Sequence, residues 1–392
     1  MIISIVTETF WPDINGVAMT LNRWVTGLLD KKHEVQLFCP QHTNRDFSQY
    51  NHLLDYHAVI GLPIPGYAEA NFGLPSRSIL KKTWKSKKPD VIYVATEGPL
   101  GWVAINLANK LNIPVLSGFH TNFQSYSKHY QLGFLEKMIS RYLKNIHNKT
   151  LATIVPTETQ KKLVSALGIE SVAILGRGAD INLFSPAKRN NTLRQSWGVD
   201  DETPVLIYVG RIAAEKNLEL AIETYRAYLK LNNKIKFVFV GSGPLEQQLK
   251  KDYSEFIFVG KKVGEELATY YASCDIFLFP SLTETFGNVV LEAMASGLGL
   301  VAFDYAAASL HVEHQINGLV ASYDNAQEFI DVARQYIEDL ELLKNVKSQA
   351  REYAMTQSWD NIVTQFEKLL LTYSGKPSPL DNLTNSKAIQ DI

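Results

Sequence analysis

Residues 274–297 read CDIFLFPSLTETFGNVVLEAMASG, and this stretch indicates how the chain folds. The apolar run Ile276–Phe279 is typical of a short, fully buried strand. A polar turn follows, and the apolar residues within 289–294 then recur at helical spacing. The pattern ends near Gly297, and glycine commonly ends helices. The stretch therefore predicts a strand, a turn and a helix.

Two carboxylates lie on either side of this turn. Glu284 is in the predicted loop, and Glu292 lies about two turns of helix further on. Between them, the helix N-terminus offers unpaired backbone N–H groups and the positive end of a dipole, which suit an anion such as phosphate. A nucleotide sugar carries both hydroxyl groups, which carboxylates can bind, and phosphates, which the helix N-terminus can bind. The alternative is an ordinary surface turn with two solvated glutamates, and the spacing alone supports it about as well as a ligand-binding turn.

Short apolar runs alternate with amphipathic segments through most of the chain. Strands are predicted at Ile2–Thr7, Glu34–Pro40, Val91–Thr96, Val115–Gly118, Thr153–Pro156, Val205–Val209, Phe237–Val240, Phe256–Val259, Ile276–Phe279 and Leu300–Phe303. Helical patterns separate many of them, such as Val17–Leu29, Gly101–Leu111 and Thr159–Leu167. This order predicts an α/β protein with two doubly wound, Rossmann-like domains and a cleft between them. Ligands of such sheets bind beyond the carboxyl ends of the strands.

Changes in composition predict the boundaries of the parts. We expect a first domain at 1–178, a connection at 179–203, a second domain at 204–357, a helix at 358–373 and a mobile polar tail at 374–392. Residues 41–88 hold a Pro/Gly-rich piece followed by KKTWKSKK, and they predict a long irregular insertion of the kind that is often functional.

The composition is that of an ordinary globular protein, with 46% apolar and 20% charged residues among 392. The two cysteines, Cys39 and Cys274, form neither a disulfide framework nor a zinc spacing. No signal peptide and no apolar run near the ~20 residues of a membrane span are evident. We therefore expect a cytoplasmic protein, with a peripheral position at the inner face of the membrane as a further option.

Charge is distributed unevenly along the chain. Residues 1–185 hold 19 Lys/Arg against 13 Asp/Glu, and the remainder holds 20 against 27. A basic half can favour an anionic membrane surface or an anionic substrate. Residues 134–149 also predict an amphipathic helix with Lys137, Arg141 and Lys144 on its polar side. Such a helix can lie on an anionic membrane, but packing on the sheet with a solvated basic face is the favoured alternative.

Candidate ligand-binding residues lie where predicted strands end. Gly16 opens a helix after the first strand, and its backbone N–H can approach a phosphate closely. Arg211 and Lys216, in GRIAAEKN, follow Val205–Val209 and suit phosphate oxygens. His120 follows Val115–Gly118 and can bind a sugar hydroxyl. Each of these residues alone has an ordinary structural explanation, as a turn glycine, a solvated loop or a core histidine.

Two other motifs carry no ligand in this interpretation. GSGPLEQ at 241–247 mimics a dinucleotide fingerprint, but Glu246 stands where that pattern needs Gly or Ala, so we exclude NAD. HVEH at 311–314 has two histidines and no obvious third ligand. No pair of aspartates ends a strand, and we predict no metal site.

Together these motifs resemble the retaining glycosyltransferases of family 4, which have the GT-B fold. The resemblance covers nearly all of residues 1–373 and is strongest in the Glu-X7-Glu element ETFGNVVLE, which runs from Glu284 to Glu292. It extends to ETFWPDINGV, ATEGPLG, GFHTNF, LGRGAD, GRIAAEKN and INGLV. The subgroup that it resembles most contains GDP-mannose-dependent α-mannosyltransferases and sulfolipid synthases. Ser309 and Leu310 depart from that subgroup, which often has Arg-Glu there, and Gly299 stands where many members have Pro.

The resemblance implies a role for each candidate residue. It places Gly16 against the donor diphosphate, with Arg211 and Lys216 neutralising its charge. It assigns Glu284 to the hydroxyl groups of the transferred sugar and Glu292 to the ribose. The remaining assignments are the backbone of Phe286, Gly287 and Asn288 to the sugar and diphosphate, His120 to the sugar, and Val263 to the base. The last helix is expected to cross back to the first domain, and no cofactor besides the donor is expected.

The predicted activity is transfer of a hexose with retention, by a front-face mechanism in which the departing diphosphate takes the proton of the acceptor hydroxyl. GDP-mannose is the first choice of donor and a UDP-sugar the second, for glucosyl or sulfoquinovosyl transfer. The expected acceptor is a lipid or glycolipid, and a soluble glycan is the alternative. A nucleotide-sugar epimerase or a non-catalytic binder would share the architecture. Nucleic acid is not an expected partner, and the sequence does not indicate the oligomeric state.

Overall fold

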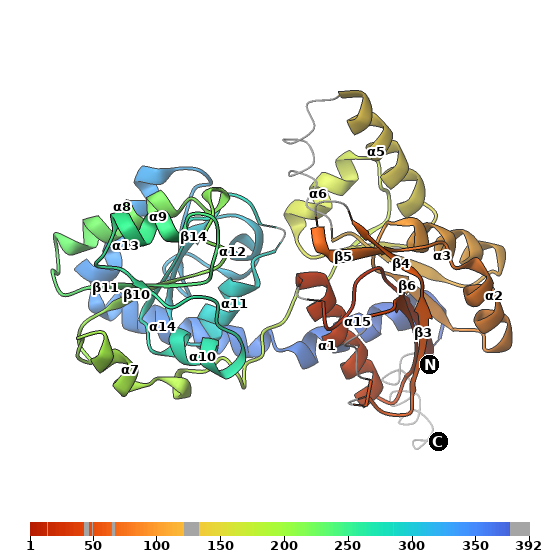
Figure 1. The fold of residues 1–392 in the computed structure, drawn as a ribbon, viewed down its shortest axis with the longest axis horizontal. Helices are drawn as coiled ribbons and strands as arrows, with labels where there is room; N and C mark the ends of the chain where they lie inside the picture. The colour runs from red at the N-terminus through yellow and green to blue at the C-terminus, as the bar shows by residue number, and fades with distance from the viewer. Residues whose placement is uncertain are drawn as a thin grey trace, which may run out of the picture. The chain divides into compact units, whose positions relative to one another are not determined.

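The computed structural model describes residues 1–13, 15–42, 47–48, 50–64, 67–120, 133–284 and 286–376. Ile14, Thr121–Phe123 and Thr285 of the motifs quoted above, and 377–392 of the expected tail, lie outside the described residues. The chain forms two compact units, Met1–Gly176 with the C-terminal residues from Asp360, and Arg177–Trp359 (Figure 1). Each has its own parallel sheet covered by helices, which confirms the predicted class. The boundaries at 178, 203 and 357 stay predictions.

The sheet of the first unit has seven strands in the order β3-β2-β1-β6-β7-β8-β9, and all neighbours are parallel. The strands are β1 (Ile2–Val6), β2 (Glu34–Pro40), β3 (Leu54–Val59), β6 (Val91–Val94), β7 (Val115–Gly118), β8 (Thr153–Val155) and β9 (Val172–Ile174). The helices are α1 (Gly16–Asp30), α2 (Arg77–Ser86), α3 (Pro99–Lys110), α5 (Gly133–His147), α6 (Glu158–Ala166) and α15 (Trp359–Ser374). The central strands were predictable because strands buried on both faces read as apolar runs.

The prediction of an irregular insertion at 41–88 is wrong. This region holds β3, the helix α2 and an antiparallel hairpin of β4 (Gly61–Ile64) and β5 (Tyr67–Gly73). β3 lies at the sheet edge and buries only Val59, so no apolar run marks it in the sequence. α2 buries Leu80 and Trp84 and exposes its lysines, so the basic run KKTWKSKK is largely the solvated side of a helix.

Helix α5 packs on the sheet, as the favoured alternative for residues 134–149 predicts. Leu143 and Ile146 are buried in the core of the first unit, whereas Lys137, Arg141 and Lys144 are exposed. The C-terminal part of the apolar side is thus buried by the protein itself, whereas Met138 and Tyr142 of the same side are 54% and 39% exposed. Within the part of the chain that is described, no helix combines the length and the apolar character that crossing a membrane requires.

Helix α15 follows the second unit in sequence but packs in the first. Phe366 stacks on Trp24 of α1 with ring centroids 4.2 Å apart. A Cβ at Gly27 of α1 would lie 2.7 Å from Val363, so the two helices approach closely at this point. The Glu367 carboxylate forms a hydrogen bond with His33 Nε2 at 2.7 Å, which adds a polar interaction beside the apolar contact.

The sheet of the second unit has six parallel strands in the order β12-β11-β10-β13-β14-β15. The strands are β10 (Val205–Val209), β11 (Lys236–Val240), β12 (Ile257–Phe258), β13 (Ile276–Phe279), β14 (Gly299–Phe303) and β15 (Leu319–Ala321). The helices are η1 (Pro186–Lys188), α7 (Asn191–Ser196), η2 (Ala214–Lys216), α8 (Leu218–Leu229), α9 (Glu246–Asp252), α10 (Gly264–Ala272), α11 (Asn288–Ala295), α12 (Ala306–His311), α13 (Ala326–Glu338) and α14 (Leu340–Thr356). Since the strands are parallel, the loops that follow β10, β13, β14 and β15 emerge at one edge.

Residues 179–203, the expected connection, contain η1 and α7 and are tied to the second unit through Asp275. The Asp275 carboxylate lies 3.0 Å from Arg194 Nη1, 3.2 Å from Arg189 Nη1 and 2.9 Å from Lys347 Nζ. Burial alone would raise the pKa of this carboxyl, but the three cations hold it below its ordinary value. The ionised group fixes the start of β13, and therefore the position of the loop at its other end.

Candidate active site

The loop between β13 and α11 is held between two well-packed elements. Ile276–Phe279 are all buried, so the strand sets where the loop begins. The loop ends at Gly287, which has a φ of +91° and precedes Asn288, the first residue of α11. Glycine adopts this left-handed conformation without the steric cost of a side chain. The predicted strand, turn and helix are confirmed here.

The Glu284 carboxylate is bound by a cation and a hydroxyl group. Lys216 Nζ lies 2.5 Å from Glu284 Oε1, and Ser281 Oγ donates to the same oxygen at 2.8 Å. Nζ also lies 3.1 Å from the Thr283 carbonyl oxygen and 3.5 Å from Ser281 Oγ. The side chains of Lys216 and Glu284 are only 16% and 15% exposed, and such shielding strengthens a charge-assisted hydrogen bond. The structure thus brings these two predicted residues together.

The two predicted cations after β10 differ in their surroundings. Lys216 ends the short helix η2, and Asn217 turns the chain into α8 with a φ of +53°. Arg211 pairs with Glu215 at 3.2 Å, and its side chain is 64% exposed. Among the described residues, no ion pair or hydrogen bond joins Arg211 to Glu284. Arg211 is therefore at the predicted edge of the sheet, but its guanidinium is directed at a surface partner.

Glu292 lies on α11 and contacts a buried tyrosine. Tyr271 OH donates to Glu292 Oε2 at 3.2 Å. Burial raises the pKa of the Glu292 carboxyl to about 7, although the bond from Tyr271 opposes the rise. Near neutral pH this group exists in both protonation states, so it can accept a hydrogen bond from a hydroxyl group or donate one to it.

Phe286 and Asn288 flank Gly287 at the start of α11. Phe286 is 1% exposed, and its carbonyl oxygen accepts a bond from the Ala307 N–H at 2.8 Å. Asn288 Oδ1 is buried and has no hydrogen-bond partner within the described chain. An unsatisfied buried acceptor beside the free N–H groups of a helix N-terminus is consistent with a polar ligand at this position.

Two residues around Phe286 were not predicted. The Arg177 guanidinium lies 5.5 Å from the Phe286 ring centroid, and the His311 ring meets Phe286 edge-on at 5.7 Å. His311 Nδ1 pairs with Tyr353 OH at 3.0 Å, and burial lowers the pKa of His311 to about 4. A neutral histidine bound in this way packs against Phe286 and Tyr353. The signal for Arg177 was present in LGRGAD, whose residues were quoted without a role.

Val263 lies between β12 and α10, on the edge of the second sheet. It is the N-cap residue of α10 in extended conformation, and its side chain is 67% exposed. Exposure of a large apolar side chain is unfavourable unless a partner covers it. The position is available to a ligand, as the predicted contact with a base requires.

Gly16 and His120 belong to the first unit. Gly16 is the first residue of α1, and the side chain of Asn15 caps this helix by accepting bonds from Val17 N and Ala18 N at 3.1 and 2.9 Å. His120 follows β7, and its Nε2 pairs with Tyr93 OH at 2.9 Å. Gly118 leaves room for this pair, because a Cβ there would lie 2.1 Å from the Tyr93 hydroxyl oxygen.

Glu8 was not predicted, although it lies within ETFWPDINGV. It follows β1, and its Oε1 accepts the Leu100 N–H of α3 at 3.0 Å. Gly98, the N-cap residue of α3, makes no side-chain cap, and a Cβ there would lie 1.8 Å from Glu8 Oε2. Burial, followed by the charge of Glu97, raises the pKa of the Glu8 carboxyl to about 7. Glu8 thus caps α3 from another strand, and this contact joins the ETFWPDINGV and ATEGPLG motifs physically.

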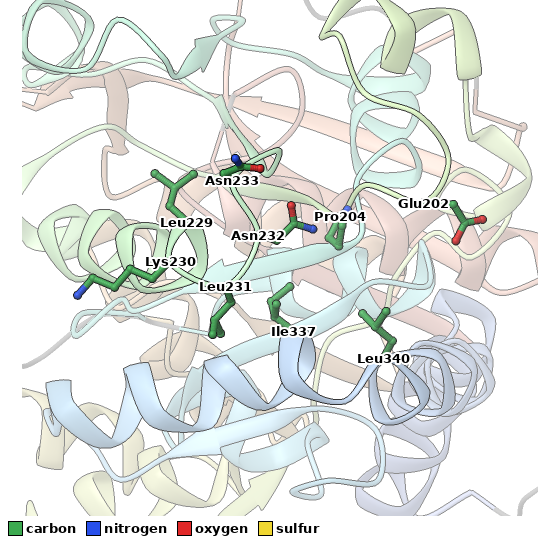
Figure 2. A pocket seen from close by; sticks show the side chains of 9 residues that line it. All are labelled: Glu202, Pro204, Leu229, Lys230, Leu231, Asn232, Asn233, Ile337 and Leu340. Carbon is green, nitrogen blue, oxygen red and sulfur yellow. The ribbon is translucent and has the colours of Figure 1, made fainter.

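A surface hollow in the second unit lies apart from these residues. Figure 2 shows the nine side chains that line it, among them Glu202, Leu229 and Leu340. None of the predicted site residues is among them. The strand ends, rather than this hollow, therefore carry the candidate chemistry.

Comparison with known proteins supports this assignment. The family model described as "Glycosyltransferase Family 4" matches residues 14–183. The model described as "Glycosyl transferases group 1" matches residues 189–353. A GDP-mannose-dependent alpha-mannosyltransferase of Corynebacterium glutamicum is 29% identical over 369 residues, which cover 93% of this chain and 87% of that protein. An alpha-monoglucosyldiacylglycerol synthase of Streptococcus pneumoniae is 28% identical, over 77% of this chain and 71% of that protein. The structure of Anabaena HepE with UDP is similar, with a TM-score of 0.76 and 20% identity over 95% of this chain and 100% of that one. The GT-B fold is thereby confirmed.

Proposed function

Since this chain belongs to the glycosyltransferases of family 4, we propose that it transfers mannose from GDP-mannose to a hydroxyl group of a lipid or glycolipid, with retention of configuration. The observation that carries the proposal is the shielded cluster of Lys216, Ser281 and Glu284 beside the N-terminus of α11. The loop supplies a carboxylate for sugar hydroxyl groups and free backbone N–H groups, and Lys216 adds a cation for phosphate from the neighbouring segment after β10.

In this proposal the residues of the second unit bind the donor. Glu284 accepts hydrogen bonds from the hydroxyl groups of the hexose. Lys216 neutralises charge on the diphosphate, and the exposed Arg211 turns from Glu215 to assist it. The N–H groups at Gly287 and Asn288 donate to the diphosphate. Asn288 Oδ1 accepts a hydrogen bond from a hydroxyl group of the sugar, a donor that it lacks within the described chain.

The nucleoside is proposed to extend toward the other edge of the sheet. Glu292 binds the ribose, and its pKa of about 7 lets it serve as donor or acceptor to a hydroxyl group. Val263 covers one face of the base and thereby loses its exposed apolar surface. From the first unit, we propose Gly16 for the diphosphate and His120 for the sugar, as the resemblance implies.

The reaction is proposed to be a front-face displacement. The acceptor hydroxyl oxygen forms a bond to the anomeric carbon while the bond from that carbon to the diphosphate oxygen breaks. The leaving oxygen takes the electron pair and then the hydroxyl proton. Lys216 and Arg211 stabilise the negative charge that grows on the diphosphate. Because this charge is larger in the transition state than in the ground state, the two cations bind the transition state more tightly.

The donor is the first part of the proposal to test. Thermal unfolding should be followed with GDP-mannose, UDP-glucose, UDP-GlcNAc and NAD, since a true ligand stabilises the folded state by RT ln(1 + [L]/Kd). We expect GDP-mannose to give the largest shift. A larger shift with UDP-glucose would support a glucosyltransferase instead, and Ser309 and Leu310, which depart from the mannosyltransferase subgroup, favour keeping that second candidate. Proton NMR of the first product formed then reports the anomeric configuration.

The acceptor and the membrane surface form the second part. Arg77, Lys81, Lys82 and Lys85 are exposed on α2, and residues 1–185 have an excess of basic groups. Each Lys or Arg side chain near an anionic lipid surface contributes about 1 kcal/mol to membrane binding. We expect the protein to float with vesicles that contain phosphatidylglycerol and to be released by salt. A variant with Lys81, Lys82 and Lys85 changed to Gln should float less, and the absence of any flotation at low salt would reject the membrane part alone.

A further inference from the structure

Three consecutive carbonyl groups of the loop between β13 and α11 are each bound by a side chain from outside the loop. The three bonds are Tyr323 OH to Leu282 O at 2.9 Å, Lys216 Nζ to Thr283 O at 3.1 Å, and Tyr305 OH to Glu284 O at 3.1 Å. A surface loop usually leaves such carbonyl groups to water. Here the backbone path that carries the Glu284 side chain is fixed from three directions.

The order of strands explains why these side chains meet there. Tyr305 comes two residues after the end of β14, and Tyr323 comes two residues after the end of β15. β14 neighbours β13 on one side with β15 beyond it, whereas Lys216 arrives from β10 on the other side. The two tyrosine rings lie 5.0 Å apart and support each other. Parallel strands therefore deliver both hydroxyl groups to the same edge as Glu284.

The backbone next to Tyr305 is strained in a way that serves this arrangement. Ala306 has a φ of +53°, a left-handed conformation that costs a residue with a Cβ about 1 kcal/mol or more. The turn lets Tyr305 bind the Glu284 carbonyl oxygen while the Ala307 N–H binds that of Phe286 at 2.8 Å. The segment after β14 thus holds the loop at two points, before and after Thr285.

We propose that Tyr305 and Tyr323 are positioning residues for recognition of the donor sugar. Their hydroxyl groups bind backbone carbonyl oxygens of the loop. They therefore act through Glu284, whose carboxylate must point at the sugar hydroxyl groups. Tyr305 binds the carbonyl group of Glu284 itself, whereas Tyr323 binds two residues earlier and is 47% exposed. Removal of the Tyr305 hydroxyl group should therefore have the larger effect. The inference rests on the function proposed above.

A positioning role and a general structural role predict different effects on the binding of two ligands, the nucleotide sugar and the nucleoside diphosphate. Glu284 is assigned to the sugar, so a misplaced Glu284 weakens binding of a nucleotide sugar but leaves binding of the nucleoside diphosphate, which has no sugar beyond the diphosphate, unchanged. A collapsed loop would weaken both ligands, because the N-terminus of α11 would move as well. The ratio of the two dissociation constants therefore isolates the positioning effect.

The test uses the full chain with Tyr305→Phe, Tyr323→Phe and the double variant. Calorimetry measures Kd for GDP and GDP-mannose, or for UDP and UDP-glucose if the wild type binds those instead. We expect Tyr305→Phe to raise Kd for the nucleotide sugar about 5-fold, the value of one net hydrogen bond, with Kd for the nucleoside diphosphate within about 2-fold. Tyr323→Phe should show the same pattern at about 2-fold, and kcat should fall with both.

Tyr336→Phe is the matched control, because Tyr336 OH also binds a carbonyl oxygen in this unit, that of Leu300 at 3.0 Å, but away from the loop. It should lower the unfolding temperature without changing the ratio of the two Kd values. An equal loss for both ligands, or no loss for the nucleotide sugar, overturns the positioning role. If the wild type binds no nucleotide sugar at all, the proposed function fails as well, so the two failures are distinguishable.

Discussion

Glu284 and Glu8 occupy comparable places in the two units, yet they are held in opposite ways. Each follows a strand of a parallel sheet and lies at the edge where helix N-termini gather. Glu284 is bound by the Lys216 ammonium and the Ser281 hydroxyl group, and its backbone is held from outside the loop. Glu8 is bound by the backbone N–H of Leu100, its charged neighbour is the carboxylate Glu97, and its pKa is raised to about 7.

The difference separates a group built to meet a ligand from one built to support a helix. A carboxylate paired with a lysine can exchange partners when a ligand binds, because the carboxylate gains the hydroxyl groups of the ligand and the ammonium gains its phosphates. A carboxylate that caps a helix has already used its acceptor, and its loss would leave backbone N–H groups unpaired. On this basis Glu284 should govern catalysis, and Glu8 should govern the stability of the first unit.

The largest effect is expected from Lys216→Ala. The variant removes the cation proposed for the diphosphate and leaves Glu284 half-buried without its ion pair, so kcat/KM should fall about 100- to 1,000-fold. Initial rates of sugar transfer measure it. Lys250→Ala is the control, since Lys250 forms a surface pair with Glu246 at 2.7 Å, and it should change the rate by less than about 2-fold. A Lys216→Ala rate within about 3-fold of wild type would contradict the assignment.

The next effect tests the cap in the first unit. In Gly98→Ala the new Cβ would lie 1.8 Å from Glu8 Oε2, so the carboxyl must leave the Leu100 N–H, and the free energy of unfolding should fall by about 1–2 kcal/mol. Gly98 has a φ of −73°, which alanine adopts without strain, so the clash is the cause.

A double-mutant cycle makes this decisive. With Glu8 already changed to Ala, Gly98→Ala should lower the free energy of unfolding by less than about 0.5 kcal/mol, because the clash is gone. Denaturant unfolding of the four proteins measures the coupling. Additive effects of the two substitutions would mean that Glu8 and Gly98 act independently.

The pH dependence of stability also distinguishes Glu8 from Glu284. The folded chain holds the Glu8 proton up to about pH 7, whereas the ordinary pKa is 4.5, so the folded state binds more protons between these values. This contribution to stability is complete below pH 4.5 and is lost as the pH rises through 7. Glu8→Gln removes the loss and keeps an acceptor for Leu100 N–H. The unfolding temperature at pH 8 should rise by about 2–4 °C, with little change at pH 5.

Glu284→Gln gives the contrast, because it breaks an ion pair that needs the charged carboxylate. Its unfolding temperature should not rise at pH 8. The pKa of Glu292 is also raised to about 7, with the same sign, so part of the pH dependence remains in Glu8→Gln. If both Gln variants shifted stability alike across pH 5–8, the distinction between Glu8 and Glu284 would be lost.

The second-unit loop was largely predictable, whereas the first-unit cap was not, and the reason is the range of the contacts. Glu284 and Glu292 follow a buried strand and lie close together in sequence, so local pattern locates both. Lys216 was predicted from the rule that parallel strands end at one edge, but that rule does not set side-chain direction. Arg211, predicted by the same rule, points instead to Glu215.

Contacts between distant segments account for what was missed. Glu8 and Leu100 are joined only by the neighbouring positions of β1 and β6, and no residue near Glu8 signals a helix cap. The strands β3, β9 and β15 were missed, and all three lie at the edges of their sheets. β3 buries only Val59 and β9 buries none of its residues fully. The tyrosines that hold the Glu284 loop lie in turns after β14 and β15, and their sequence contains no motif for that role.

The smallest effect concerns how each region uses small residues. The first unit has glycine at 98 for space alone, whereas the second has alanine at 306, where φ is +53° and glycine would be unstrained. Ala306→Gly should relieve about 1 kcal/mol of strain, partly offset by the greater entropy of glycine in the unfolded chain, for a net gain of roughly 0.5 kcal/mol. Ala307→Gly, within the same helix turn, has no such strain to lose and should destabilise by about 0.5–1 kcal/mol. Equilibrium unfolding compares the two. Opposite signs would mean that the segment holds Tyr305 at a conformational cost, and equal losses would mean that the left-handed turn at 306 is not strained.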